Sequence, residues 1–561
     1  MTTHELLPLI VAVVGHRNLR PEDVPMLEAR VEEVLRALQA EAGATPLMLL
    51  SALAEGADRL VARVALRINM PLLVPLPKER IAYEAEFTSD ESRAEFRELI
   101  GRAERWFELD ATEGVMLHGE DHHYRHLIAF LASHCQVLLA LWDGVEKALP
   151  GGTADAVHFK LEGIPSRLDT HRTPLDPPDI GPVYHIVTPR MTNPAVNGVP
   201  GSCRCLLPGR VQGATGGETF ARVIRHMNAF NTDIKITLED ALAQSAPTPL
   251  VPQALLKEYS APVIAEERAF EEADTLARYF QRKTNMVVTS FMVLAFFALF
   301  SFEVYAYYYS EYPTILLLYV VPIAAAYGLF LVARHKDYQN KYLDYRALAE
   351  GLRVQWFWHV SGSEASVADH YLRKQRTELD WIRHAIRIWH LRLNPRVSTE
   401  KSPSTRTGFL HTLEHLVEDQ AAYYARSEKR DAARAHHLSL WSNRLFLMGM
   451  IIAAAHVAWQ LLFNESQPSY PILMSMSMVL IIAGLLVIYG DKRGFSAQAK
   501  QFSRMAEMYA AAGPRIREAL AQDDVATVDA LILELGRETL AENGDWVMMH
   551  RERPLEVPKL G

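Results

Sequence analysis

The stretches MVVTSFMVLAFFALFSFEVY, residues 286–305, and TILLLYVVPIAAAYGLFLVA, residues 314–333, decide the class of this chain. A second pair follows, LFLMGMIIAAAHVAWQLLF at 445–463 and PILMSMSMVLIIAGLLVIY at 471–489. Each run is close to the roughly 20 apolar residues that a helix needs to cross the core of a bilayer. The sequence therefore predicts four transmembrane helices that contact the lipid bilayer. The alternative, four buried helices of a large soluble protein, requires core helices of unusual length and apolarity.

Basic residues flank the four runs on one side only: Arg282 and Lys283, Arg334 and Lys336, Arg444, and Lys492 and Arg493. The short connectors at 306–313 and 464–470 contain no lysine or arginine. An excess of lysine and arginine marks the cytoplasmic side of a membrane protein. We therefore expect both termini and the long middle segment to be cytoplasmic.

Charge and cysteine content exclude some classes of partner. The 561 residues carry a formal net charge of −9, which offers no general attraction for nucleic acid, and we expect no nucleic-acid partner. Three cysteines do not form a disulfide framework. His122 and His126 have a spacing that can ligate zinc, but the segment 118–126 is polar and typical of a solvated helix start. We assign no metal site.

The first 240 residues alternate strand-like and helix-like segments. Continuous apolar runs, typical of buried strands, occur at 9–14, 47–50, 72–74, 137–141 and 183–187. Helical spacing occurs between them, at 22–41, 57–67, 84–104, 124–133 and 154–162. This alternation predicts a Rossmann-like α/β domain, in which helices cover both faces of a parallel sheet.

Ligands of such sheets bind beyond the carboxyl ends of the strands. Glycine at these ends permits close backbone approach, Arg17 can pair with a phosphate, and the start of a helix favours an anion. Asp58 repels a phosphate, so we expect it to cap its helix or to meet a ribose hydroxyl. The candidate ligand-binding residues are Gly15, His16, Arg17, Ser51, Glu55, Gly56, Ala57, Asp58, Asp143, Gly144, Gly151, Gly152 and Thr153. Ordinary turn chemistry is the alternative explanation of these motifs.

Four motifs in this order resemble the SLOG superfamily, Rossmann-like domains related to the DNA-processing protein A family and to the LOG nucleotide hydrolases. They are VVGHRNL at 13–19, SALAEGADRLVA at 51–62, VLLALWDG at 137–144 and PGGTADAV at 150–157. The resemblance implies that the domain binds a nucleotide or a nucleotide-derived second messenger as its ligand, with no further cofactor.

The resemblance does not carry over the chemistry of LOG hydrolases, which use a Pro-Gly-Gly-x-Gly-Thr-x-x-Glu motif. Counted from Pro150, this chain has Ala154 for the third glycine, Asp155 for the threonine and His158 for the catalytic glutamate. We therefore assign no catalytic residue and favour a sensor over an enzyme. A membrane-anchored nucleotide phosphoribohydrolase is the alternative, and a membrane scaffold whose α/β domain has lost its ligand is a third reading.

The two apolar pairs and the helices after them indicate an internal duplication. When Lys336 is aligned with Arg493, Tyr345 matches Phe502 and Ala349-Glu350 matches Ala506-Glu507. This plan resembles SLATT domains, two-helix membrane modules found with SLOG sensors in bacterial conflict systems. The resemblance implies a pore-forming effector of antiviral defence in the bacterial inner membrane, working as a homo-oligomer.

The expected organisation is a sensor domain at 1–240, a first two-helix module at 253–395 and a second at 408–540. Residues 372–393, which lie between the two repeated hairpins, combine tryptophan with many arginines. This segment is predicted either to lie on the inner membrane surface or to be an ordinary amphipathic helix of a bundle.

Overall fold

The computed structural model describes residues 4, 6–109, 122–145, 151–165, 168, 178–192, 196–209, 215–363, 365–371, 376–393, 405–463 and 469–552. The chain forms two compact units. The α/β unit comprises residues 1–240, 260–269 and 366–401, and the helical unit comprises 241–259, 270–365 and 402–561. An α/β domain followed by an all-helical region with four long apolar helices confirms the predicted fold class.

The α/β unit is built on one seven-stranded sheet with the order β4-β3-β2-β1-β5-β6-β7. Neighbouring strands are parallel except β6 and β7, which are antiparallel. Side chains of β2, β3 and β5 are buried throughout because helices cover both faces. The strands are β1 (Leu9–Gly15), β2 (Leu47–Leu50), β3 (Leu72–Leu76), β4 (Arg105–Glu108), β5 (Val137–Trp142), β6 (Val183–Val187) and β7 (Cys203–Leu206).

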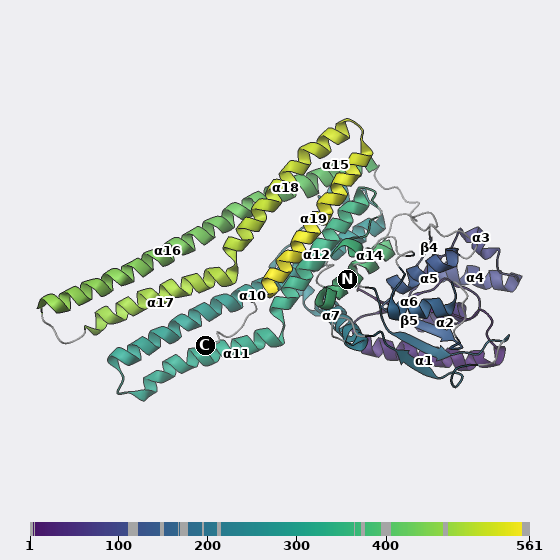
Figure 1. The fold of residues 1–561 in the computed structure, drawn as a ribbon, viewed down its shortest axis with the longest axis horizontal. Coiled ribbons are helices and arrows are strands. Elements are labelled where there is room, and N and C mark those ends of the chain that lie inside the picture. The colour runs from purple at the N-terminus through teal and green to yellow at the C-terminus, as the bar shows by residue number, and fades with distance from the viewer. Residues whose placement is uncertain are drawn as a thin grey trace. The chain divides into compact units, whose positions relative to one another are not determined.

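Helices α1 and α2 pack together on one face of the sheet, and α5 and α6 pack together on the other (Figure 1). Helix α1 buries Leu27, Val31, Leu35 and Leu38, whose spacing places them along one stripe. The helices of the N-terminal region are α1 (Val24–Ala42), α2 (Ala57–Arg67), α3 (Arg80–Glu84), α4 (Asp90–Arg102), α5 (His122–His134), α6 (Thr153–Glu162) and α7 (Gly216–Ile236).

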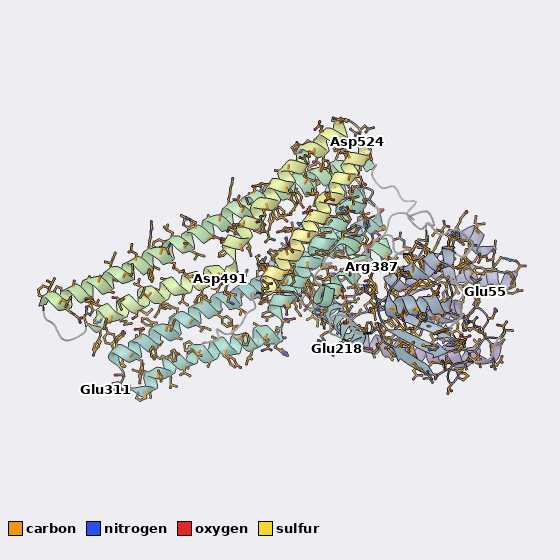
Figure 2. All side chains as sticks on the ribbon, viewed as in Figure 1. Glu55, Glu218, Glu311, Arg387, Asp491 and Asp524 are labelled. Atoms are coloured by element: carbon orange, nitrogen blue, oxygen red, sulfur yellow. The ribbon has the colours of Figure 1, made fainter. Side chains whose placement is uncertain are left out.

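Helix α14 (Arg376–Leu393) belongs to the α/β unit although it follows the first pair of apolar helices in sequence. It packs against α7 and α5. The ring of Trp381 lies 5.9 Å from that of Phe230, and Arg387, labelled in Figure 2, donates to the carbonyl oxygen of Ser133 at 2.8 Å. The apolar side chains that suggested a membrane-surface helix are buried here, so the amphipathic packing alternative describes α14.

The helical unit contains two long hairpins, each followed by a further helix (Figure 1). In the first hairpin the ring of Phe302 lies 5.4 Å from that of Tyr319. In the second, α16 and α17 pack along each other. The helices are α8 (Leu238–Gln244), α9 (Gln253–Leu256), α10 (Ala261–Tyr308), α11 (Leu317–His335), α12 (Tyr338–Val360), α15 (Thr405–His411), α16 (Asp419–Phe463), α17 (Tyr470–Arg493), α18 (Phe495–Ala521) and α19 (Val525–Arg551).

Within the described part of the chain, four helices are long and apolar enough to cross a membrane, and they contain the four predicted runs. Their apolar side chains face outwards. Leu461 and Leu462, for example, are each 79% exposed. Helices of a soluble core bury such residues, and apolar surface of this extent marks contact with lipid or with another chain.

One local prediction was wrong, and two strands were missed. The helix predicted over 84–104 begins later: α4 covers only Asp90–Arg102, Ser89 caps it by accepting from the backbone nitrogen of Ser92, and Glu84 belongs to the separate short helix α3. Strands β4 and β7 were not predicted. Both are edge strands with only partly buried side chains, so neither has the continuous apolar run by which the central strands were found.

Candidate ligand-binding site

A cavity of about 310 Å³ lies beyond the carboxyl ends of β1 and β5. From β1 the chain turns to β2 on one side, whereas β5 is followed by β6 on the other. The loops that follow two such strands diverge and leave a crevice, the usual ligand position in open α/β sheets. The lining residues are Gly15, His16, Arg17, Asn18, Trp142, Val145, Gly151, Gly152, Thr153, Ala154, Arg190 and Thr192.

Two glycines allow the loops around this crevice to pack closely. A Cβ atom on Gly15 would lie 2.4 Å from the Cβ of Ala57 and 2.8 Å from the carbonyl oxygen of Leu141. Gly56 has a φ of +80°, and its Cβ would lie 2.2 Å from the carbonyl oxygen of Arg17. The backbone nitrogen of Ala57 donates to the carbonyl oxygen of His16 at 3.0 Å, which joins the start of α2 to the loop after β1.

Arg17 lies over the ring of Tyr124, 5.3 Å from its centroid. The hydroxyl of Tyr124 donates to Glu86, which also forms an ion pair with Lys78. Burial tends to raise the pKa of Glu86, but hydrogen bonds from Lys78 and Tyr124 hold it below its usual value. Lys78 therefore balances Glu86, and Arg17 adds a positive charge to the cavity wall.

His16, Asp143 and Arg190 form a second cluster at the same edge. The backbone nitrogen of Asp143 donates to Nε2 of His16 at 2.9 Å, so this nitrogen acts as an acceptor and we assign the proton to Nδ1. Nε of Arg190 lies 2.9 Å from Oδ2 of Asp143, and the Asp143 side chain is fully buried. The guanidinium of Arg190 thus neutralises a carboxylate that would otherwise repel an anion.

The start of α6 forms another part of the cavity wall. Gly152 is its N-cap and has no side chain to cap the first turn. Gly151 takes a φ of +81°, and its backbone nitrogen donates to Oδ2 of Asp155 at 2.9 Å. The first backbone N–H groups of a helix lack intrahelical acceptors and carry the positive end of its dipole. Gly152, Thr153 and Ala154 present this helix start to the cavity.

The structure brings six of the thirteen candidate residues together along the cavity: Gly15, His16, Arg17, Gly151, Gly152 and Thr153. The remaining seven candidate residues do not line the cavity. Oγ of Ser51 accepts from the backbone nitrogen of Leu53 at 3.2 Å, and Glu55, labelled in Figure 2, accepts from Ser92 of α4. Ala57 packs behind Gly15, Asp143 is buried behind Arg190, and Gly144 has a φ of +74° in the turn after β5.

Asp58 is buried in the first turn of α2. Burial raises the pKa of this carboxyl to about 7, although a hydrogen bond with the backbone of Ala54 and the charges of Arg17 and Arg59 oppose the shift. The carboxylate thus fastens the loop before α2. Asp58 is not among the residues that line the cavity.

Arg190 and Trp142 line the cavity but were not predicted as site residues. Trp142 is the last residue of β5 and directly precedes the predicted Asp143-Gly144, so a wider motif would have included it. Arg190 follows β6, and the sequence around it has no glycine-rich turn that points to a ligand. Only the position of β6 beside β5 brings Arg190 to this edge.

Within the described part of the chain, no group of three or more His, Cys, Asp or Glu side chains is arranged to hold a metal ion. Of the predicted histidine segment, His118, Glu120 and Asp121 lie outside the described residues, as does Pro150 of the glycine-rich motif.

Comparison with protein-family models finds no match, and comparison with curated proteins finds no matching relative. The class of this protein therefore rests on its own sheet topology and its long apolar helices. The chain combines a Rossmann-like, mostly parallel sheet with four candidate transmembrane helices, which makes it a membrane protein with a substantial α/β unit.

Proposed function

We propose that the chain is a membrane-embedded sensor and effector, which binds a nucleotide-derived signal in its α/β unit and perturbs the membrane through its two hairpins. The observation that carries the sensor is the cavity at the β1/β5 edge, where Arg17, Arg190 and the start of α6 meet. A volume of about 310 Å³ is at the lower end of the range for small-molecule sites.

The chemistry of the cavity favours a phosphate-bearing ligand. Unsatisfied N–H groups at the start of α6 suit phosphate oxygens, and Arg17 can form charge-assisted hydrogen bonds with them. Trp142 supplies an aromatic surface on which a nucleobase can stack. Among the described residues the lining contains no Asp or Glu side chain, which supports retention of an anion.

The effector half of the proposal rests on the duplicated hairpins and on their resemblance to SLATT modules. Binding shifts the helical unit only if the ligand prefers the active arrangement, because equal affinity for two states leaves their populations unchanged. We propose that a homo-oligomer in the bacterial inner membrane, with both termini cytoplasmic, then opens or disrupts the bilayer in antiviral defence.

The alternative is a membrane-anchored nucleotide phosphoribohydrolase. General acid or base catalysis needs a titratable group within hydrogen-bond reach of the reacting bond. Three of the predicted ligand-binding residues carry a carboxylate, Glu55, Asp58 and Asp143; none of them lines the cavity, and Asp58 and Asp143 are buried. This observation favours binding over hydrolysis. Release of a free base or of ribose phosphate from nucleotides by the purified protein, lost on substitution of either aspartate, is the outcome that supports the enzyme.

Gly152 offers a sharp test of the proposed site. Its φ of −88° is open to any residue, and aspartate is a preferred N-cap. Gly152→Asp therefore preserves or strengthens α6 while it places a carboxylate where the phosphate is proposed to bind. Gly152→Asn provides a neutral N-cap as the matched control. We expect the aspartate variant to lose at least about tenfold in affinity for its nucleotide and the control to keep most of it.

The full chain in lipid nanodiscs is titrated calorimetrically with a panel of nucleotides and cyclic dinucleotides. Arg17→Ala tests the contribution of this arginine to the cavity wall, and Arg36→Ala, at an exposed position of α1, is its control. In cells, a membrane-potential dye then reports whether the same variants prevent depolarisation. The sensor-gated proposal is overturned if no nucleotide binds, or if cells that express Gly152→Asp or Arg17→Ala depolarise to the same extent as cells that express the unchanged protein.

A further inference from the structure

A second polar cavity lies inside the helical unit, between the two copies of the duplicated module. The alignment that places Lys336 on Arg493 also places Asp274 of α10 on Asp431 of α16. Both aspartates are buried, with 5% and 2% of their surface exposed. Corresponding buried carboxylates in the two copies indicate a shared structural role.

Each of these aspartates is shared by two arginines. Asp274 lies 2.9 Å from Nη1 of Arg346 and 2.9 Å from Nε of Arg278. In the second copy, Asp431 lies 2.9 Å from Nε of Arg430 and 3.3 Å from Nη1 of Arg434.

The neighbouring pair Glu350 and Arg353 is internally neutral. Each copy therefore has one more guanidinium than carboxylate at this position, and the two surplus positive charges flank the same space. Arg430 and Arg434 are about half exposed, but Arg278 and Arg346 are only 25% and 28% exposed, and a surplus of positive charge at such partly buried positions is costly unless an anion balances it.

The cavity has a volume of about 230 Å³. It receives Arg278 and Arg346 from the first copy and Arg430 from the second, together with hydrogen-bonding amides and the aromatic side chains of Tyr424 and Trp546. The other lining residues are Ala277, Gln281, Tyr342, Tyr423, Asp431, Gln498, Phe502, Glu542 and Asn543. Donors thus surround the space from α10, α12, α16, α18 and α19.

We propose that this cavity binds a small dianion, of the sulfate or phosphate-monoester class, between the two copies of the module. The site is separate from the cavity at the sheet edge, and the inference does not depend on the proposed nucleotide sensor. An anion held by guanidiniums of both copies links the copies together on one side of the candidate spans, so its binding and release offer a way to change how the hairpins pack.

Two carboxylates, Asp431 and Glu542, line the cavity; Asp431 is paired with Arg430 and Arg434, and Glu542 is the group whose protonation is expected to change when an anion binds. Burial raises its pKa to about 7, Glu350 and Asp545 add to the shift, and Gln501 of α18 opposes it. From the other helices packed here, Tyr424 of α16 and Tyr509 of α18 lie close enough to the same carboxyl to interact with it electrostatically. A bound dianion disfavours the ionised form of Glu542, so binding is accompanied by proton uptake and weakens as pH rises through about 7.

Labelled sulfate is the probe, because it keeps two negative charges over the whole pH range used. Equilibrium dialysis of the full chain in zwitterionic nanodiscs, at constant ionic strength, counts the bound ions. The measurements are made on Gly152→Asp protein, which removes the proposed site at the sheet edge. Arg430 is half exposed, so Arg430→Gln is expected to fold. Arg517→Gln removes an exposed arginine of the same unit, paired with Glu418, and serves as the control.

We expect one sulfate per chain at pH 6, roughly tenfold weaker binding after Arg430→Gln, and unchanged binding after Arg517→Gln. Affinity should fall between pH 6 and pH 8, and Glu542→Gln should retain the pH 6 affinity at pH 8. The proposal is overturned if the Gly152→Asp protein binds no sulfate, if Arg430→Gln and Arg517→Gln behave alike, or if Glu542→Gln leaves the pH dependence intact. Because Gly152→Asp is present throughout, failure here is distinct from failure of the nucleotide site.

Discussion

Asp337 and Gly494 take the same left-handed backbone conformation, with φ of 53° and 63°, where each hairpin meets the helix that follows it. They stand one residue after Lys336 and Arg493, the pair used to align the duplicated modules. The backbone therefore repeats in the register that the side chains suggested. A left-handed residue at this point ends one helix and redirects the chain into the next.

The two positions respond oppositely to glycine exchange. Asp337→Gly removes a strained conformation and should raise the free energy of unfolding by up to about 1 kcal/mol, whereas Gly494→Ala should lower it by about 1 kcal/mol. Gly484→Ala is the control, since a Cβ there has no neighbour within 4 Å. Thermal unfolding in detergent provides the measurement. Equal effects of the Gly494 and Gly484 variants would contradict a conformational role for Gly494.

Gly15 sets how closely β1, β5 and α2 approach. Gly15→Ala introduces contacts of 2.4 Å and 2.8 Å with Ala57 and the Leu141 carbonyl, and overpacking of this kind costs about 1–3 kcal/mol or more. We expect a lower unfolding midpoint and loss of nucleotide binding. Gly101→Ala of α4, which meets nothing within 4 Å, should be neutral or stabilising. Full stability of Gly15→Ala would show that the loops can separate without cost.

The pair of Asp143 and Arg190 invites a double-mutant cycle. Arg190→Met leaves a fully buried carboxylate without its cation, a loss that typically costs about 3–5 kcal/mol. Asp143→Asn in the same chain removes the stranded charge, so the double variant should recover most of the lost stability while it binds nucleotide poorly. Denaturation followed by tryptophan fluorescence measures the coupling. Additive effects of the two substitutions would exclude a direct interaction.

Asp58 predicts a pH dependence of the α/β unit. Its pKa is about 7 in the folded protein against 3.8 for the free side chain, so the folded state holds this proton more tightly. Its contribution to stability is therefore present at low pH and is lost as pH rises from about 4 through about 7.

Asp58→Asn should stabilise α2 at pH 8, by about 2–4 kcal/mol, and change little at pH 4. Hydrogen exchange of α2 in the intact chain, corrected for intrinsic rates, measures the local opening. Asp90, exposed at the start of α4, is the control with the opposite sign: hydrogen bonding and charge attraction from Arg93 lower its pKa. A pH-independent gain on Asp58→Asn would contradict the raised pKa.

Chemical labelling of introduced cysteines can test the predicted orientation of the chain in the membrane. In a Cys203→Ser, Cys205→Ser background, Ser310→Cys in the first connector should react with a membrane-impermeant maleimide added to intact cells, because this connector is predicted to lie outside. Lys429→Cys, exposed on α16, should react only after permeabilisation. The reverse pattern would place the termini on the outer side.

The sequence predicted the elements that have a long or regular apolar pattern. The runs at 47–50 and 183–187 are β2 and β6, and the helical segment at 57–67 is α2. In a continuous apolar strand or a long apolar helix, nearly every residue is apolar, so the sequence alone indicates that the segment lies in a protein core or in a membrane. Strands β4 and β7 do not, because they lie at the edges of the sheet and only partly bury their side chains.

For the candidate site, the glycine-rich turns after β1 and before α6 could be found because their chemistry is local. Arg190 could not, because its role arises from contact with Asp143 across two strands. Likewise, Trp381 stands between the hairpins in sequence, and nothing in its neighbourhood indicates that it packs on Phe230. Local pattern predicts elements, whereas long-range pairing decides which elements share a site.

The return of α14 to the α/β unit limits how this protein can be divided. A fragment that stops at residue 240 lacks Trp381 and leaves the face of α7 around Phe230 uncovered. Such an exposed apolar face promotes aggregation. The α/β unit therefore cannot be separated from the rest of the chain as one continuous amino-terminal fragment. A recombination event that exchanged it between genes would have to carry the stretch between the hairpins along with the amino-terminal segment.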